Sequence, residues 1–248
     1  MFTLSNRVAI VTGASSGLGA RFAAVLAGAG AHVVATARRI DRLKELSESE
    51  PKIDPVQADV TVGEDRQRLV ATTLERYGRV DILVNNAGMG SGGPEQQSSL
   101  DVFRSVLALN LEAVFAMCQA VAEPMRAQGS GSIINIGSMF GLVASVPVGD
   151  AGYVASKSAV NGLTRELANQ WGTDGVRVNA IAPGWFLTEM TTELFEDEKT
   201  QRWLARQLPL GRPCQIDELD GVLLFLASDA SSYCTGQVIA IDGGYTIR

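Results

Sequence analysis

A tyrosine and a lysine four positions apart, Tyr153 and Lys157, are the first residues in this sequence whose types and spacing suggest catalysis. They open a long helical pattern, and residues at this spacing lie on one face of a helix. A free phenol has a pKa of about 10, and a neighbouring cation lowers that value by roughly 1 to 3 units. The pair therefore suits proton exchange with a substrate oxygen. The same spacing also occurs by chance in surface pairs, so its weight depends on context.

A glycine-rich turn supplies that context near the start of the chain. A β-branched run ends at Thr12 and leads through this turn into an amphipathic helical pattern. Glycines let the backbone approach a pyrophosphate, and the free N–H groups of a helix N-terminus stabilise the anion. We expect dinucleotide contacts from Gly13, Ser15, Ser16, Gly17, Leu18 and Gly19. The alternative is a tight strand-to-helix turn without a ligand.

The second expected strand ends in Thr36-Ala37-Arg38-Arg39 and has no acidic residue before Asp41. A carboxylate at this place would accept from a ribose 2'-OH, whereas arginines bind a 2'-phosphate. We therefore expect NADP(H) to be preferred over NAD(H), with Arg38 and Arg39 as ligands. The alternative is a solvated basic pair. Asp59 and Val60 follow the third strand and are expected near the adenine, although Asp59 could equally cap a helix.

Five further residues, at three places in the chain, could contact cofactor or substrate. Ser138 follows the fifth expected strand, and its hydroxyl could bind a substrate oxygen. Asn86, Ala87 and Gly88 follow the fourth strand, where small residues suit a backbone close to a ribose or ring. Asn110 interrupts a helical pattern, which often marks a local distortion or a bound water.

The elements that must position these residues alternate between strands and helices. Short β-branched runs are expected to form strands at 7–11, 32–36, 55–58, 82–84, 132–136, 177–181 and 238–241, with helical patterns between them. This alternation predicts an α/β fold: a Rossmann-type, doubly wound parallel sheet of about seven strands with helices on both faces. We expect one domain, 1–248, that both binds the dinucleotide and carries the catalytic residues. An acidic helical pattern at 188–210 is expected to form a lid over the substrate.

Composition excludes several functional classes. A net charge of -6 and a pI near 4.9 provide no cationic surface for nucleic acid. No apolar run approaches the length of a membrane span, and residues 1–7 lack a signal-like pattern, so we expect a cytoplasmic protein without membrane contacts. The cysteines Cys118, Cys214 and Cys234 are expected to be reduced. With His32 as the single histidine, we expect no metal site and no Ser-His-Asp triad.

Together these residues closely resemble the short-chain dehydrogenase/reductase family, in the single-domain branch of 3-oxoacyl reductases and sugar, steroid and ketone reductases. The resemblance covers essentially the whole chain and extends to Pro183-Gly184, Thr188 and Asp242-Gly243-Gly244. It implies hydride transfer between nicotinamide and a carbonyl or secondary alcohol carbon, with Tyr153 exchanging the proton on oxygen. It also implies that Ser138 orients that oxygen and that Lys157 binds the ribose and lowers the phenol pKa. Asn110 would hold a relay water, and Thr188 would bind the carboxamide.

The segment between Ser138 and Tyr153 is about two residues longer than is usual in that family, so analogy says less about the substrate. We expect a small, mainly apolar substrate pocket lined by Met139, Phe140, Leu142, Val143, Val146, Trp185, Phe186, Leu187 and Met190. Family resemblance alone suggests a homotetramer. A 3-oxoacyl-(acyl-carrier-protein) reductase is the main alternative function, although an acidic lid disfavours an acidic carrier protein. A non-catalytic dinucleotide-binding sensor is a remote alternative, because it would not explain Ser138, Tyr153 and Lys157 together.

Overall fold

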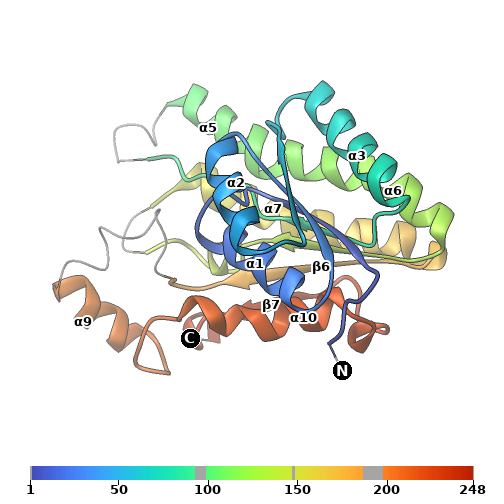
Figure 1. Cartoon of the computed structure of the whole chain (residues 1–248). Helices are drawn as coiled ribbons and strands as arrows, with labels where there is room; N and C mark the ends of the chain where they lie inside the picture. The colour runs from blue at the N-terminus through green and yellow to red at the C-terminus, as the bar shows by residue number, and fades with distance from the viewer. Residues whose placement is uncertain (1, 93–98, 147–148, 187–197, 248) are drawn as a thin grey trace.

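The computed structural model describes residues 2–92, 99–146, 149–186 and 198–247 (Figure 1). Seven strands form one parallel sheet in the order β3-β2-β1-β4-β5-β6-β7. The strands are β1 Val8–Thr12, β2 His32–Ala37, β3 Ile53–Gln57, β4 Ile82–Asn85, β5 Gly131–Ile136, β6 Val176–Pro183 and β7 Val238–Ile241. Because the order reverses between β1 and β4, a crevice opens at the carboxyl ends of these two strands. The expected doubly wound sheet is confirmed.

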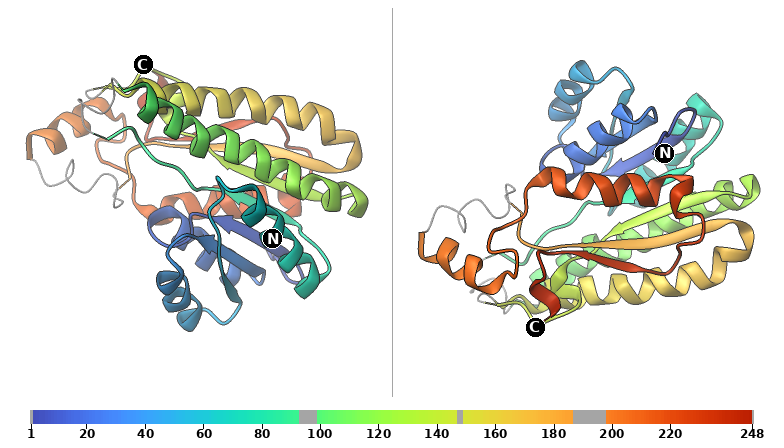
Figure 2. Two further views of the ribbon diagram at one scale, coloured as in Figure 1. Left: turned by 90° about the horizontal axis from the view of Figure 1, so that it is seen from above. Right: turned by 90° about the horizontal axis from the view of Figure 1, so that it is seen from below.

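Helices cover both faces of the sheet (Figures 1 and 2). On one face lie α1 Gly17–Gly28, α2 Ile40–Ser49 and α10 Asp220–Ala227, which share one hydrophobic core. On the other lie α3 Gly63–Tyr77, α6 Ala113–Gln128 and α7 Ala151–Trp171, around a second core. Alternate residues of each strand enter opposite cores, as Ala9 and Val11 do on one face and Ile10 does on the other. Most strand residues are therefore apolar, as a sheet buried on both faces requires, although β3 and β6 also carry charged residues such as Asp54 and Arg177.

The third strand differs from its expected bounds. It begins at Ile53, before Pro55, whereas we placed its start at the proline. Pro55 lies opposite Ala35 of β2, and β3 is the outer strand of the sheet. An edge strand tolerates proline because one side of it has no ladder to complete. The prediction failed because the sequence did not show that this strand lies at the edge.

The expectation that no segment is apolar and long enough to span a membrane was wrong. By length and composition alone, the continuous helix Leu100–Gln128 could cross one. It consists of α5 Leu100–Leu107, the π-helical turn η1 Ala108–Glu112, and α6. Its apolar side chains, including Val114, Met117, Val121 and Met125, lie in the core against the sheet. Core helices of globular proteins pass the same test, so the segment is weak evidence for a membrane span.

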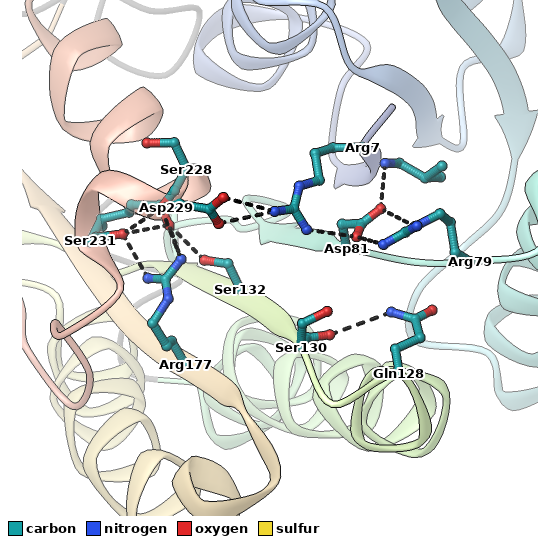
Figure 3. A network of polar contacts seen from close by, with 12 residues as sticks. Arg7, Arg79, Asp81, Gln128, Ser130, Ser132, Arg177, Ser228, Asp229 and Ser231 are labelled. Carbon is teal, nitrogen blue, oxygen red and sulfur yellow. Dashed lines mark hydrogen bonds and ion pairs between the residues drawn. The ribbon is translucent and has the colours of Figure 1, made fainter. Parts of the chain in front are cut away.

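A network of charged side chains joins the amino ends of the strands, opposite the crevice (Figure 3). Asp81, whose side chain is 2% exposed, accepts hydrogen bonds from the guanidinium groups of Arg7 and Arg79 and from the backbone N–H of Val8. Arg7 also binds the exposed carboxylate of Asp229 through two hydrogen bonds of 3.0 and 3.1 Å. The network thus connects β1 and the residue before β4 to the end of α10.

Arg177 completes this network from β6. Its guanidinium donates to the backbone carbonyls of Leu226 and Ser228 and to the hydroxyl of Ser231. Cations near the C-terminus of a helix bind its unpaired carbonyls and complement its dipole. Burial lowers the pKa of this guanidinium. Arg177 therefore acts as a cap that fixes α10 to the sheet.

Replacing Asp81 by Ala should lower the free energy of unfolding by roughly 2–3 kcal/mol, because two arginines lose a buried partner and remain only partly hydrated. The same change at Asp229, whose side chain is 87% exposed, should cost less than about 1 kcal/mol. Urea denaturation at a fixed protein concentration measures both. Equal losses would show that burial of Asp81 contributes nothing special to stability.

Candidate active site

A cleft of about 680 Å³ runs along the carboxyl edge of the sheet. It is lined by the ends of several strands and by the N-terminal part of α7. The expected site residues that line it are Gly13, Ser15, Ser16, Gly17, Leu18, Gly19, Arg38, Arg39, Asp59, Val60, Asn86, Ala87, Gly88, Ser138, Tyr153, Lys157, Pro183 and Gly184. Asn110 lies behind the residues that line the cleft, and Thr188 lies outside the described residues.

The glycine turn between β1 and α1 has no room for a side chain at Gly13 or at Gly19. Gly13 and Gly17 have positive φ angles of 67° and 53°. A Cβ on Gly19 would lie 2.3 Å from the carbonyl oxygen of Gly13. Ser16 is the N-cap of α1 and makes no side-chain capping bond, so first-turn N–H groups of the helix are available for a ligand. This turn fits a pyrophosphate group.

The two arginines after β2 lie beside this turn. The Arg39 guanidinium donates to the hydroxyls of Ser15, at 3.0 and 3.1 Å, and Ser16, at 2.7 Å. Arg38 also lines the cleft, and it interacts electrostatically with Asp59. Asp41 lies within α2, as expected. The described residues thus place two cations and no carboxylate at the end of β2.

Asp59 lines the cleft rather than capping a helix. Its carboxylate accepts from the backbone N–H and the hydroxyl of Thr61, and these bonds, followed by the charge of Arg38, lower its pKa. The N-cap of α3 is Val62 instead. Thr36, which we did not predict, also lines the cleft, and its buried hydroxyl has no hydrogen-bond partner among the described residues. These polar groups suit the adenosine half of a dinucleotide.

Tyr153, Lys157 and Ser138 meet at the other half of the cleft. The ammonium of Lys157 lies 5.6 Å from the centroid of the Tyr153 ring and donates to the carbonyl of Ile136 at 2.8 Å. The hydroxyl of Ser138 lies close enough to the phenol to lower its pKa by hydrogen bonding. Ser138 also caps the short helix η2 Met139–Gly141 by accepting from the N–H of Phe140. One acid, one hydroxyl donor and one cation therefore converge at one place.

The pKa of the phenol departs from our expectation. We expected Lys157 to lower it, but burial raises it, and the charge of Asp150 adds to the increase; only the bond from Ser138 opposes them. Burial also lowers the pKa of Lys157 to about 8, so this ammonium gives up its proton more easily than a free lysine. Burial is the first cause of both shifts, and Lys157 is not among the causes that act on the phenol.

Asn110 lies in η1, so the distortion expected at this residue is confirmed. Its amide accepts from the N–H of Met89 at 2.9 Å and donates to the carbonyl of Met89 at 2.8 Å. It also donates to the hydroxyl of Ser156, the residue directly before Lys157 on α7. A π-helical turn often occurs at a functional site, because it reorients one side chain without ending the helix.

Most of the apolar side chains that we expected to line the substrate pocket do not line the cleft. Among those that the structure describes, Phe186 lines the cleft. Met139 and Trp185 are buried with Leu204 and Leu208, while Phe140 packs edge-on against Trp185 and Tyr245. Leu142 and Val146 are exposed, and Leu187 and Met190 lie outside the described residues. The cleft instead has lining residues that we missed: Met89, Ser105, Ala108, Leu109 and Ile136. Their only signal was position: Met89 follows β4, Ser105, Ala108 and Leu109 lie in the following helix, and Ile136 ends β5.

The expected lid is only partly described. Residues 188–197 lie outside the described part of the chain, and α9 Glu198–Gln207 follows them. Trp203 and Leu204 of α9 pack against the cluster of Met139 and Trp185. The closing of this segment over a substrate stays a prediction. In the described ranges there is no group of three or more acidic, histidine or cysteine side chains that could hold a metal ion.

Comparisons with known proteins place this geometry among nicotinamide-dependent enzymes. A family model described as enoyl-(acyl carrier protein) reductase matches residues 13–246. Gluconate 5-dehydrogenase of Gluconobacter oxydans is 39% identical, over 100% of this chain and 97% of that protein. The 3-oxoacyl-(acyl-carrier-protein) reductase of Thermotoga maritima is 38% identical, over 98% and 99%. A crystal structure of a gluconate 5-dehydrogenase from Burkholderia cenocepacia, in complex with NADP and tartrate, has a TM-score of 0.93 at 36% identity, covering 100% of this chain and 98% of that one.

Replacing Gly19 by Ala should weaken NADPH binding at least about tenfold, because a Cβ there would collide with backbone and displace the turn. Gly28→Ala is the matched control on the same helix, since a Cβ at Gly28 has no neighbour within 4 Å. Fluorescence titration with NADPH measures both affinities, and circular dichroism checks the fold. Because alanine favours helices over glycine, the substitution should not weaken α1 itself. An unchanged affinity in Gly19→Ala would therefore mean that the turn does not hold the cofactor.

Proposed function

The chain belongs to the short-chain dehydrogenase/reductase family, and on that premise we propose that its cleft binds NADP(H) and that Tyr153 is the acid/base group. It is an oxidoreductase that interconverts a carbonyl and a secondary alcohol. The observation that supports our assignment of residues is the convergence of Ser138, Tyr153 and Lys157 in the same cleft as the glycine turn. A non-catalytic sensor would have no use for these three side chains.

Each side chain has a distinct task in the proposed mechanism. The bound nicotinamide supplies or accepts the hydride. Ser138 donates a hydrogen bond that orients the substrate oxygen, and Tyr153 gives that oxygen its proton in reduction or removes it in oxidation. Lys157 binds the cofactor ribose and stabilises the phenolate by its charge. Asn110 would hold a water molecule in the proton path, while Pro183, Gly184 and Thr188 would face the nicotinamide.

We propose a preference for NADP(H) over NAD(H). A 2'-phosphate needs cations, and Arg38 and Arg39 line the cleft beside Ser15 and Ser16. A carboxylate at the end of β2 would repel that phosphate, and Ala37 provides none. The NADP complex of the Burkholderia relative supports the same cofactor.

Replacing Arg38 or Arg39 by Ala should weaken NADPH binding by about ten- to a hundredfold, as loss of a charge-assisted hydrogen bond does, and should change NADH binding little. Lys44→Ala is the control, because this exposed lysine lies on α2 away from the cleft. Isothermal titration with both cofactors measures the ratio. Equal affinities of the unchanged protein for NADPH and NADH would disprove the preference.

The substrate we propose is a small, neutral carbonyl compound or its alcohol. The lining residues at the catalytic half of the cleft include Met89, Leu109 and Phe186, and the cationic lining residues are Arg38, Arg39 and Lys157. Arg38 and Arg39 belong to the adenosine half, so among the described lining residues Lys157 is the one cation near the reaction centre. The named relatives act on gluconate and on a 3-oxoacyl carrier protein, so a sugar acid or an acyl thioester is the alternative. An NADPH absorbance screen over ketones, sugars, sugar acids and 3-oxoacyl thioesters separates these classes.

Two further proposals follow from the family rather than from the site. We propose a homotetramer, because closed symmetric assembly is the usual form of such oligomers. We also propose a cytoplasmic location, where free thiols such as Cys118 stay reduced.

Replacing Tyr153 by Phe should lower kcat by about 10²- to 10⁴-fold and leave NADPH affinity nearly unchanged, because the change removes only the proton donor. Single-turnover kinetics and a fluorescence titration measure the two quantities. Thr246→Val, which removes a hydroxyl bound to Asp242 near the C-terminus, is a control for loss of a polar group elsewhere. If Tyr153→Phe retained more than about a tenth of kcat, the phenol would not be the acid/base group.

A further inference from the structure

Asp150 is a polar residue near the site to which the mechanism above gives no role. It is the N-cap of α7, and its carboxylate accepts from the backbone N–H of Tyr153 at 2.9 Å. The same carboxylate accepts from the hydroxyl of Ser91 at 2.5 Å and from the N–H of Ser91 at 2.8 Å. Ser91 is only 6% exposed, so these are enclosed contacts. An ordinary helix cap needs the first bond and not the other two.

The contacts of Asp150 close a ring around the catalytic tyrosine. The loop after β4 is held at Met89 by Asn110 and at Ser91 by Asp150. Asn110 reaches back to Tyr153 through Ser156, whose hydroxyl donates to the carbonyl of Tyr153. Asp150 reaches the N–H of the same tyrosine. Both peptide groups of Tyr153 are therefore tied to the loop that lines the cleft.

The close packing at this junction leaves little freedom. A Cβ on Gly152 would lie 3.1 Å from the hydroxyl of Ser91. The backbone N–H of Asp150 donates to the hydroxyl of Ser145, so the backbone of Asp150 is also held within the long segment between Ser138 and Tyr153. Asp150 thus connects three segments at the position where α7 begins.

We propose that Asp150 is a positioning residue of the reaction, which ties the backbone of Tyr153 to the loop after β4 at Ser91 and places a negative charge beside this residue that keeps its phenol protonated. The proposal rests on the assignment of Tyr153 as the acid/base group. A carboxylate disfavours a nearby phenolate and so raises the phenol pKa, in the direction found for Tyr153. The residue would favour the form of Tyr153 that donates a proton to a carbonyl.

Other charges near the phenol can be identified. On α7 the second charged group facing it is Lys157. The turn η2 and Asn110 of η1 present neutral groups, and Glu112 of η1 is exposed. On α5, which packs against α7, the charged residues are Asp101 and Arg104, which pair with each other and are 91% and 67% exposed. Within the described residues, Asp150 is therefore the carboxylate whose removal should affect Tyr153 most.

Asp150→Asn tests the proposal, because the amide oxygen can retain the cap while the charge and one acceptor are lost. The midpoint of tyrosinate formation at Tyr153 should move down by about 0.5 pH unit or more. The protein has four tyrosines. We would therefore titrate tyrosinate absorbance without cofactor and isolate Tyr153 by difference, from Tyr153→Phe and from the double variant Asp150→Asn/Tyr153→Phe. The limb of the pH profile for alcohol oxidation should move in the same direction.

Ser91→Ala separates the positioning role of Asp150 from the effect of its negative charge. It removes the hydroxyl contact and keeps the carboxylate, so kcat should fall about three- to tenfold, as for one lost positioning hydrogen bond, with an unchanged midpoint. Asp101→Asn controls for the loss of a negative charge elsewhere and should alter neither quantity. If Asp150→Asn does not fold, Asp150→Ser keeps a capping oxygen without the charge and takes its place.

An unchanged Tyr153 midpoint in the neutral Asp150 variant would overturn the role of the charge, and full activity in Ser91→Ala would overturn the positioning role. A loss of thermal stability without either of the other effects would mean that Asp150 serves only as a helix cap. Failure of the proposed function is distinguishable, since Tyr153→Phe would then remain active or the unchanged protein would oxidise no alcohol. The titration without cofactor gives its result in either case.

Discussion

The contact between β1 and β4 is the constraint on which the rest of the site depends. These strands are far apart in the chain but adjacent in the sheet, because the first three strands extend to one side and the later ones to the other. Thr12 fixes their ends together: its hydroxyl accepts from the N–H groups of Asn86 and Ala87 at 3.0 and 3.1 Å. The Asn86 amide returns a bond to the carbonyl of Thr12. The glycine turn and the loop after β4 therefore form two walls of one cleft.

Charge is distributed differently at the two edges of the sheet. At the amino edge, Arg7, Arg79 and Asp81 satisfy one another, and Arg177 is neutralised by helix carbonyls. At the carboxyl edge, Lys157 is buried beside a phenol without an ion pair in the described residues. Buried charge without a partner is costly, and such sites usually perform chemistry. The same sheet thus separates a stabilising edge from a reactive one.

Similarity over the whole chain does not by itself identify a substrate in this family. This chain is 36–39% identical to the relatives named above over nearly its full length, yet those relatives act on gluconate or on a 3-oxoacyl carrier protein. The glycine turn and the Tyr153 helix do not distinguish these substrates. The segments that can are those following Ser138 and Gly184, which pack on α9 through Met139, Phe140 and Trp185. These side chains pack against one another and against α9. They therefore influence the shape of the pocket mainly by fixing the position of the backbone that lines it.

The sequence by itself determined the sheet, the order of the turns at its carboxyl edge and the choice of residues that we propose for catalysis. These follow from local patterns: strand periodicity, glycines that a tight turn requires, and a Tyr-Lys spacing that one helix face enforces. Only the tertiary structure decided that Pro55 lies in an edge strand, that Phe140 packs on Trp185 rather than in the cleft, and that Asp150 binds Ser91. It also decided the direction of the Tyr153 pKa, which depends on burial and on charges from the fold. Contacts between distant segments and the solvent they exclude are not encoded in any local pattern, and they require the folded chain.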